Sequence, residues 1–259
     1  MSRLLTRRQL IGTGIATAAG STAILAGARY GLMPPDHPGI FGIGETLTYS
    51  AQRLLTSGQS LAREFTRGQI SKISPVNGPA PTDDIYRQWA ANQFDGWRLT
   101  VDGLVARPLS FSLGELKRLP AQNHITLHAC EEGWSYIAEW TGVRLASLLD
   151  MVGTRPEARY AVFVPFPNPN QQTGFVRPLW DSIDMADALH PQTLLAYGMN
   201  GETLPEDHGA PLRLRATRHM GYKNTKYLSR IILTDSMDHF GRGLGSRAAQ
   251  GGNAWYGGI

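Results

Sequence analysis

The chain has 259 residues, of which 42% are hydrophobic and 18% are charged, and it contains one cysteine. This composition allows a sizeable buried core, so it excludes an intrinsically disordered protein and a coiled coil. A single cysteine also excludes an intramolecular disulfide framework. We therefore expect a globular chain in which Cys130, if it has a role, acts without a second cysteine.

The first 28 residues have the pattern of an export signal. Three arginines and no acid precede an uncharged stretch from Gln9 to Ala28, which ends in small residues. A basic start, an apolar stretch and a small-residue end are typical of a cleaved signal, and the pair Arg7-Arg8 resembles a twin-arginine signal. We expect cleavage after Ala28 and a periplasmic mature protein. The alternative is an uncleaved signal that anchors the chain in a membrane.

The charge of the whole chain is uninformative about nucleic acid. The net charge is +4, and the three arginines of the first segment leave +1 for the rest of the chain. The sequence pI of 9.3 therefore reflects a segment that we expect to be removed. Because a basic balance in the mature chain is the usual mark of a nucleic-acid-binding protein, we predict no nucleic-acid partner.

Residues 29–81 are predicted to form an N-terminal linker and helical segment. Gly and Pro are frequent before residue 45 and again at 74–81, which is typical of loops. Between them, from Glu45 to Phe65, apolar residues recur at near-helical spacing with an interruption at Ser57-Gly58. This pattern predicts one broken helix or two short ones.

Residues 82–240 are predicted to form the main domain. A helix start at Thr82-Asp83-Asp84 opens it, and Ser112 with Glu115 makes a capping box for a second helix. Asp102-Gly103 and Asn200-Gly201 are hairpin turn signals. Further helices are expected at 143–152 and 182–189, and strands at 97–101, 123–130, 160–166, 193–199, 203–204, 212–217 and 228–234.

These helices and strands do not alternate regularly, so the sequence predicts a mixed α+β fold rather than a doubly wound one. Residues 241–259 contain seven glycines. We predict that this Gly-rich C-terminal tail lies over the surface of the domain.

Cys130 is the first candidate for chemistry. It ends a predicted strand whose polar face also carries His124 and His128. A thiolate there is a soft metal ligand, and in an oxidising compartment ligation protects it from oxidation. The alternatives are an inert buried thiol, a zinc site with the two histidines, and a catalytic Cys-His pair with His208 or His219.

A basic segment is the second candidate. Residues 209–234 contain no acid and six basic residues, which are Arg213, Arg215, Arg218, Lys223, Lys226 and Arg230. Arg213 and Arg215 lie on one face of a predicted strand, and Gly221 allows a close backbone approach in the next loop. The segment suits a small ligand that carries a phosphate. The alternative is a solvated basic face.

Three motifs, taken together in this order, carry a family resemblance. They are Trp97-Arg-Leu-Thr-Val-Asp-Gly, His128-Ala-Cys-Glu-Glu-Gly-Trp-Ser135 and Gly209-Ala-Pro-Leu-Arg-Leu. The stretch from Trp97 to Asp235 resembles the molybdopterin-binding domain of the sulfite oxidase family. Within it, the chain is more similar to the exported bacterial members of the methionine sulfoxide reductase type. The resemblance implies a mixed-sheet, sulfite-oxidase-type molybdopterin-binding fold.

The resemblance also implies a cofactor and its binding residues. Cys130 would be the protein ligand of molybdenum in Mo-molybdopterin, and the catalytic residue. His128, His208 and Arg213, together with the stretch Asn224-Thr225-Lys226, would hold the pterin and its phosphate. These positions agree with the acid-free basic segment.

Three positions depart from the reductase pattern. Glu131 follows the cysteine where close relatives usually have Val or Ala, Pro165 stands in place of a cofactor-contacting threonine, and His208 replaces an asparagine. No arginine-rich sulfite pocket is assignable, and no haem or dimerisation domain is seen after residue 235. Sulfite is therefore the less favoured substrate.

We thus expect a periplasmic molybdenum-dependent oxidoreductase that transfers an oxygen atom to or from a small substrate. Its expected partners are the twin-arginine translocase during export and an electron-transfer protein such as a cytochrome or a membrane haem protein. A sulfite oxidase is the alternative enzyme. A cofactor-free binding module that retains only the fold is the alternative of another class.

Overall fold

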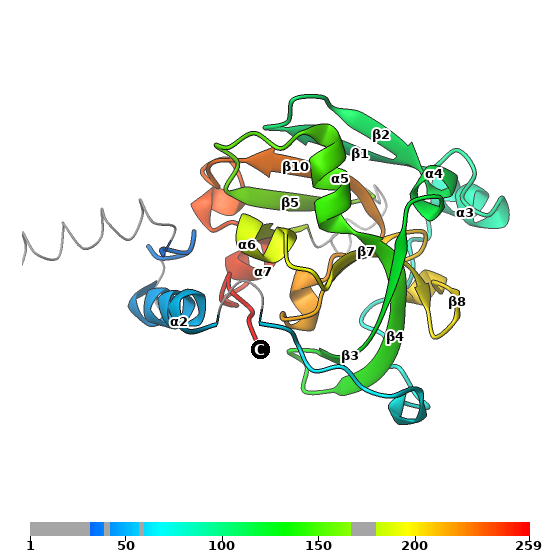
Figure 1. Ribbon diagram of the computed structural model, residues 1–259, viewed down its shortest axis with the longest axis horizontal. Helices are drawn as coiled ribbons and strands as arrows, with labels where there is room; N and C mark the ends of the chain where they lie inside the picture. Colours follow the sequence, from blue (N-terminus) through cyan, green and yellow to red (C-terminus); the bar gives the residue numbers. More distant parts are fainter. Residues whose placement is uncertain (1–31, 39–41, 57–59, 167–179) are drawn as a thin grey trace, which may run out of the picture.

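The computed structural model of the chain describes residues 32–38, 42–56, 60–166 and 180–259. Two sheets and several short helices make up this part (Figure 1). The predicted export signal lies outside the described residues.

The first sheet has the strand order β2-β1-β10-β5-β6. Strands β1 and β10 are parallel, with Val101 opposite Ile231, and the other pairs are antiparallel, so this is a mixed sheet as predicted. The bounds are Arg98–Gly103 for β1, Leu109–Ser112 for β2, Tyr160–Pro165 for β5, Asp181–Asp184 for β6 and Leu228–Thr234 for β10.

The second sheet is antiparallel, with the order β3-β4-β7-β8 and with β9 paired to β7. Asn200 and Gly201 join β7 to β8 with positive φ angles of 53° and 84°, which confirms the predicted hairpin. The bounds are Ala121–Ala129 for β3, Ser135–Arg144 for β4, Thr193–Met199 for β7, Glu202–Thr203 for β8 and Arg213–Ala216 for β9.

The helices are short, and their predicted caps are present. The side chain of Asp83 accepts from the Tyr86 amide at the start of α3, and Ser112 and Glu115 form the predicted capping box of α4. The α-helices are α2 (Gly42–Leu55), α3 (Asp84–Ala91), α4 (Leu113–Lys117), α5 (Leu145–Val152), α6 (Met185–Ala188) and α7 (Arg247–Gln250). The 3-10 helices are η1 (Arg67–Gln69), η2 (Glu206–His208), η3 (Gly221–Lys223) and η4 (Gly241–Gly243).

The main core unites both sheets through α5. Apolar side chains of β1, β5 and β10 from the first sheet and of β4, β7 and β9 from the second meet the buried leucines of α5. Fully burying each such side chain contributes about 1.5–3 kcal/mol. The core therefore fixes β9 directly and β3 through its pairing with β4, and the candidate site lies at the ends of these strands. The α+β prediction is confirmed.

Four local predictions are wrong. Asp102 and Gly103, expected to form a hairpin turn, are the last residues of β1, and β2 begins only at Leu109. The first half of the helix expected at 182–189 is β6, whose residues are buried on both faces, so their periodicity resembles that of a buried helix. Residues 60–65 are not helical, and the helix that begins near Glu45 ends at Leu55. The segment 241–259 is more than a surface tail, because Trp255 is buried and contacts the rings of Tyr49 and Tyr160.

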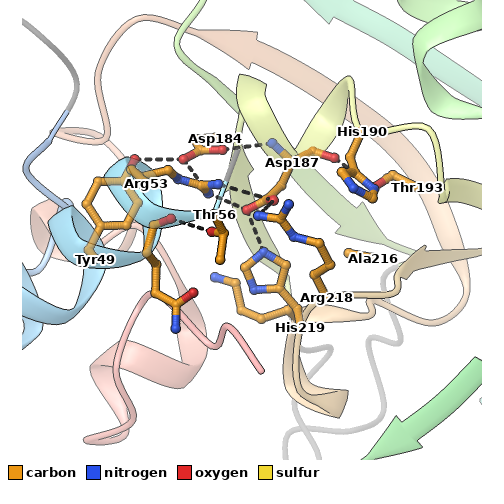
Figure 2. A network of polar contacts seen from close by, with 12 residues as sticks. Tyr49, Arg53, Thr56, Asp184, Asp187, His190, Thr193, Ala216, Arg218 and His219 are labelled. Atoms are coloured by element: carbon orange, nitrogen blue, oxygen red, sulfur yellow. Dashed lines mark hydrogen bonds and ion pairs between the residues drawn. The ribbon is translucent and has the colours of Figure 1, made fainter. Parts of the chain in front are cut away.

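A buried ion network attaches α2 to the rest of the molecule (Figure 2). Arg53 forms ion pairs with Asp184, at 2.6 Å, and with Asp187. The Tyr49 hydroxyl donates to Asp184 at 2.7 Å, and His219 Nε2 lies 2.7 Å from Asp187 Oδ2. Burial raises the pKa of Asp187, but His219 and Arg53 outweigh it and hold that pKa well below its usual range.

Within the described ranges, no helix is both long enough and apolar enough to span a bilayer.

Candidate active site

An open cavity lies where the ends of β3, β5 and β9 meet the loops after η2 and η3. The space between its walls is about 1040 Å³, open solvent at the mouth included. All seven residues proposed from the sequence line it, namely His128, Cys130, His208, Arg213, Asn224, Thr225 and Lys226. The fold therefore brings together positions that are up to 98 residues apart in the sequence.

Cys130 lies just after β3, at the start of a tight turn. Its amide donates to the Trp134 carbonyl at 2.9 Å, and Gly133 closes the turn with a positive φ of 91°. The sulfur lies 3.3 Å from Glu131 Oε2. Burial, with the neighbouring Glu131 carboxylate, raises the pKa of the Cys130 thiol to about 11, although Glu132 and Asn77 oppose the shift. The thiol is thus protonated at neutral pH until a cation such as a metal replaces the proton.

His128 lies on β3, two positions before Cys130, and its ring is buried. The rings of Trp134, Tyr136 and Trp140 surround it, with centroids 5.1–6.1 Å away. Its Nδ1 has no hydrogen-bond partner among the described residues. Burial, and then the charges of Arg215 and Arg213, lower the pKa of His128 well below its usual value. The imidazole is therefore neutral and has one nitrogen available to a ligand.

Arg213 is a buried cation that no carboxylate neutralises. It is 3% exposed, and its guanidinium lies 4.9 Å from the centroid of the Trp140 ring. Its terminal nitrogens donate to the carbonyls of His208 and Asn224, while Nε has no partner in the described part of the chain. None of the ion pairs between described residues includes Arg213. A buried charge in this state favours the binding of an anion.

Arg215 lies over the Trp140 ring like Arg213, as expected for one strand face, but its role differs. It does not line the cavity, and instead it donates to the Leu127 carbonyl at 2.5 Å and to the amide oxygen of Asn224 at 3.2 Å. Burial, followed by the charge of Arg213, lowers the pKa of Arg215 to about 9. Arg215 thus joins β9 to β3 and adds positive charge behind the cavity. A solvated basic face, the alternative for this segment, is excluded for these two arginines because both are buried.

The loop after η3 forms another wall. The Thr225 hydroxyl is buried and has no partner among the described residues. The Asn224 side chain, in contrast, is held by the protein, because its oxygen accepts from the Ala216 amide and its nitrogen donates to the Met220 carbonyl, both at 2.8 Å. Asn224 therefore shapes the loop, and Thr225 offers its hydroxyl to the cavity. The binding roles of both residues stay predictions.

Gly221 permits the close approach of this loop. A Cβ atom at Gly221 would lie 3.2 Å from His128 Nε2 and 3.5 Å from the Cα of Cys130, which is tighter than ordinary packing for the first contact. The backbone of η3 therefore runs directly over β3.

Lys226 and His208 also line the cavity. The Lys226 ammonium donates to the carbonyls of Asn77 and Asp207 at 2.7 and 2.8 Å, so it fixes the loop that carries Asn77. Burial, with the charge of Arg213, lowers the pKa of Lys226 to about 8. Burial, with Arg213 and Lys226, lowers the pKa of His208 to about 4, so this imidazole is neutral at pH 7.

The Pro-rich stretch 75–81 is the part of the cavity that sequence reasoning missed. It was predicted to be a loop, and the loop lines the cavity from Pro75 to Pro79 and at Pro81. Tyr222 and Phe166 also line it, as does Pro165, which stands where the reductase pattern has a threonine. No periodicity or motif could have revealed this wall, because long-range packing alone brings the loop to β3.

The two other chemistries proposed for Cys130 find less support. In the described part of the chain, no three His, Cys, Asp or Glu side chains are arranged to hold a metal ion, so the zinc site is absent there. His124 instead lies 2.7 Å from the Glu64 carboxylate. His219, one of the two bases proposed for a hydrolase, belongs to the ion network around Asp187.

Comparison with known proteins identifies the family. The family model described as the oxidoreductase molybdopterin binding domain matches residues 87–240, more than half of the chain. The chain belongs to this family. The predicted cofactor, Mo-molybdopterin, and the predicted class, a molybdopterin-dependent oxidoreductase, are thereby confirmed.

Two curated relatives and one solved structure are similar to this family member. It is 36% identical over 185 residues to the putative protein-methionine-sulfoxide reductase subunit YedZ1 of Azospira oryzae, covering 71% of this chain and 65% of the relative. It is 34% identical over 145 residues to the protein-methionine-sulfoxide reductase catalytic subunit MsrP of Ralstonia nicotianae, covering 54% and 44%. The sulfane dehydrogenase SoxCD of Paracoccus pantotrophus gives a TM-score of 0.48 at 24% identity, over 55% of this chain and 40% of that one. The chain thus spans about two thirds or less of the length of these proteins.

The cavity fits the molybdopterin of this family. A soft sulfur ligand, a neutral imidazole with an unpartnered nitrogen, a free hydroxyl and an uncompensated guanidinium all line one space. Such a set matches a metal bound to an anionic pterin, because a thiolate can bind the metal and a guanidinium can bind the phosphate. The residues that the resemblance implied are therefore in positions to act together.

Proposed function

We propose that this molybdopterin oxidoreductase reduces a sulfoxide in the periplasm. The observation that carries the proposal is the placement of Cys130 in the same cavity as Arg213, a buried cation without a carboxylate. Two relatives that are more than 30% identical carry the name protein-methionine-sulfoxide reductase, which supports a sulfoxide as the substrate.

In this proposal each residue has one task. Cys130, as a thiolate, would hold molybdenum through its sulfur, while Arg213 and the Thr225 hydroxyl would hold the phosphate. His128 would bond the pterin through Nδ1, and Lys226 holds the loop around Asn77 that lines the cavity. When bound, the cofactor supplies the two-electron chemistry of oxygen-atom transfer. The aromatic wall of Trp134, Tyr136 and Phe166 limits the access of water to the reacting atoms.

The proposal includes an export route and an electron donor. Residues 1–28 direct export through the twin-arginine translocase, which suits a protein that must bind its cofactor before crossing the membrane. Since the resemblance offers one redox centre, electrons enter from a partner, such as a periplasmic cytochrome or a membrane haem protein.

A substrate comparison tests the function. The purified exported protein is assayed with methionine sulfoxide and a reduced dye, and in parallel with sulfite and an oxidised cytochrome. We expect sulfoxide-dependent oxidation of the dye and at least about tenfold lower kcat/KM for sulfite. Activity with sulfite alone would replace the proposed function with sulfite oxidation.

A further inference from the structure

The outward face of α2 is apolar, although most surface helices place their polar residues outward. Every exposed side chain of α2 is uncharged, and the four largest are Ile43, Leu47, Leu54 and Leu55, at 83%, 66%, 70% and 83% exposure. Residues 43, 47, 51 and 54 follow the i, i+4, i+8, i+11 spacing of one helical stripe. An uninterrupted apolar stripe on a surface marks a site of contact.

The body of the protein fixes this orientation. The inward face carries the polar residues Tyr49 and Arg53, which bind Asp184 and Asp187 in the buried network of Figure 2. The Arg53 guanidinium also lies 5.2 Å from the centroid of the Tyr49 ring. Turning the helix to bury its leucines would leave two carboxylates buried without Arg53, which is costly. The apolar stripe is therefore held outward.

We propose that the apolar stripe of α2, formed by Ile43, Leu47, Ala51, Leu54 and Leu55, binds the surface of a lipid bilayer. The stripe offers no charge with which to orient a protein partner. A helix of 14 residues is about 21 Å long and about 10 Å wide, so its face is on the order of 200 Å². A stable dimer needs about 800 Å² per partner, whereas a bilayer accepts one helix face.

The position of α2 in the sequence supports a lipid surface. The uncharged stretch that we propose as an export signal ends at Ala28, and α2 begins at Gly42, with 13 residues between them. An extended chain of that length spans at most about 45 Å. The stripe is thus tied in sequence to a segment that meets a membrane during export. In Figure 1, α2 lies at the edge of the molecule, away from β8 and α3.

Vesicle flotation tests this proposal. The exported protein is mixed with phosphatidylcholine vesicles, and the bound fraction gives a partition coefficient. The test variant is the double substitution Leu47→Ser and Leu54→Ser. The matched control is Ile85→Ser with Leu189→Ser, which removes two exposed apolar side chains, at 54% and 46% exposure, elsewhere on the surface.

We expect the wild type and the control to float, and the α2 variant to lose at least about tenfold in partition coefficient. Hydrogen exchange of the α2 amides should slow when vesicles are added. Circular dichroism checks that each variant is folded, and because the replaced side chains are exposed, we expect no loss of structure. If the wild type does not float, or if the α2 variant floats as well as the control, the proposal is wrong. Loss of a wild-type dimer in the α2 variant, without vesicle binding by the wild type, would assign the stripe to a second copy. The test does not depend on the substrate of the enzyme.

Discussion

Arg53 and Arg213 are both largely shielded from solvent, with 10% of the Arg53 side chain and 3% of Arg213 exposed, and their surroundings differ in one respect. Arg53 forms ion pairs with the carboxylates of Asp184 and Asp187, so acids of the same chain compensate its positive charge. Arg213 donates to two backbone carbonyls and lies over the Trp140 ring, and no carboxylate of the described residues forms an ion pair with it. The first arrangement stabilises a contact between α2 and the body, and the second favours an anionic ligand. Buried charge alone therefore does not identify a binding site, whereas a buried cation that lines a cavity without an acid partner indicates one.

The largest expected effect is at Cys130, which lines the same cavity as Arg213. Cys130→Ser should reduce oxygen-transfer activity by more than about 100-fold, because even the loss of an outer partner of a metal ligand costs 10–100-fold. Steady-state assays on the purified variant measure this. Activity within about threefold of the wild type would exclude a ligand role for Cys130.

The two arginines themselves give the second test. In cofactor-free protein, Arg53→Met should lower the free energy of unfolding by about 3 kcal/mol, because it leaves two acids without their shared partner. Arg213→Met should change it by no more than about 1 kcal/mol, because no acid loses its charge partner. Urea denaturation of both variants measures the difference. Equal losses would show that the two clusters do not differ as described.

A pH profile gives a smaller effect. The pKa of His208 is lowered to about 4 in the folded protein, against about 6.5 in the unfolded chain. The unfolded state therefore binds more protons between these values, and the stability present above pH 6.5 is lost as the pH falls toward 4. We expect the free energy of unfolding of His208→Asn to fall by roughly 1–2 kcal/mol less than that of the wild type over this pH range. This value allows for solvent near the ring.

The measurement is the difference between the wild-type and His208→Asn curves of unfolding free energy against pH. Identical slopes between pH 7 and 4.5 would contradict the assignment.

The smallest effect concerns the acid beside the thiol. Glu131→Gln should lower the pKa of Cys130 below its value of about 11 in cofactor-free protein, because a neutral amide replaces a carboxylate 3.3 Å from the sulfur. A change of roughly half a pKa unit raises the thiolate fraction at pH 8 about threefold. The rate of alkylation by iodoacetamide between pH 8 and 11 measures the thiolate fraction. An unchanged rate would show that Glu131 does not raise the pKa of Cys130.

The sequence predicted one of these clusters and missed the other, for a physical reason. The cavity was predicted because Cys130 and Arg213 lie in local motifs that resemble a family, and the acid-free run around Arg213 is visible without a structure. Asp184 and Asp187 lie where a helix was predicted, and nothing local indicates that they meet Arg53, 131 or more positions away. Motifs carry chemistry, but pairing across the chain depends on packing.

The same limit explains the errors in the fold. Hairpin and capping signals at Asn200-Gly201 and Ser112 act within a few residues, and the structure has them as predicted. Strand β6 is buried on both faces, so its pattern does not distinguish it from a helix. The burial of Trp255 depends on Tyr49 and Tyr160, which are far away in the sequence.

The central claim is that the uncompensated cations around Arg213 and the thiol of Cys130 form one molybdopterin site. The most direct test is to quantify molybdenum and the pterin released on denaturation, per chain, in the natively exported protein and in its Cys130→Ser and Arg213→Met variants. The account predicts about one molybdenum and one pterin per wild-type chain. It predicts loss of molybdenum from Cys130→Ser and a lower pterin content in Arg213→Met. Wild-type protein without either, from a host that loads other molybdenum enzymes, would contradict it.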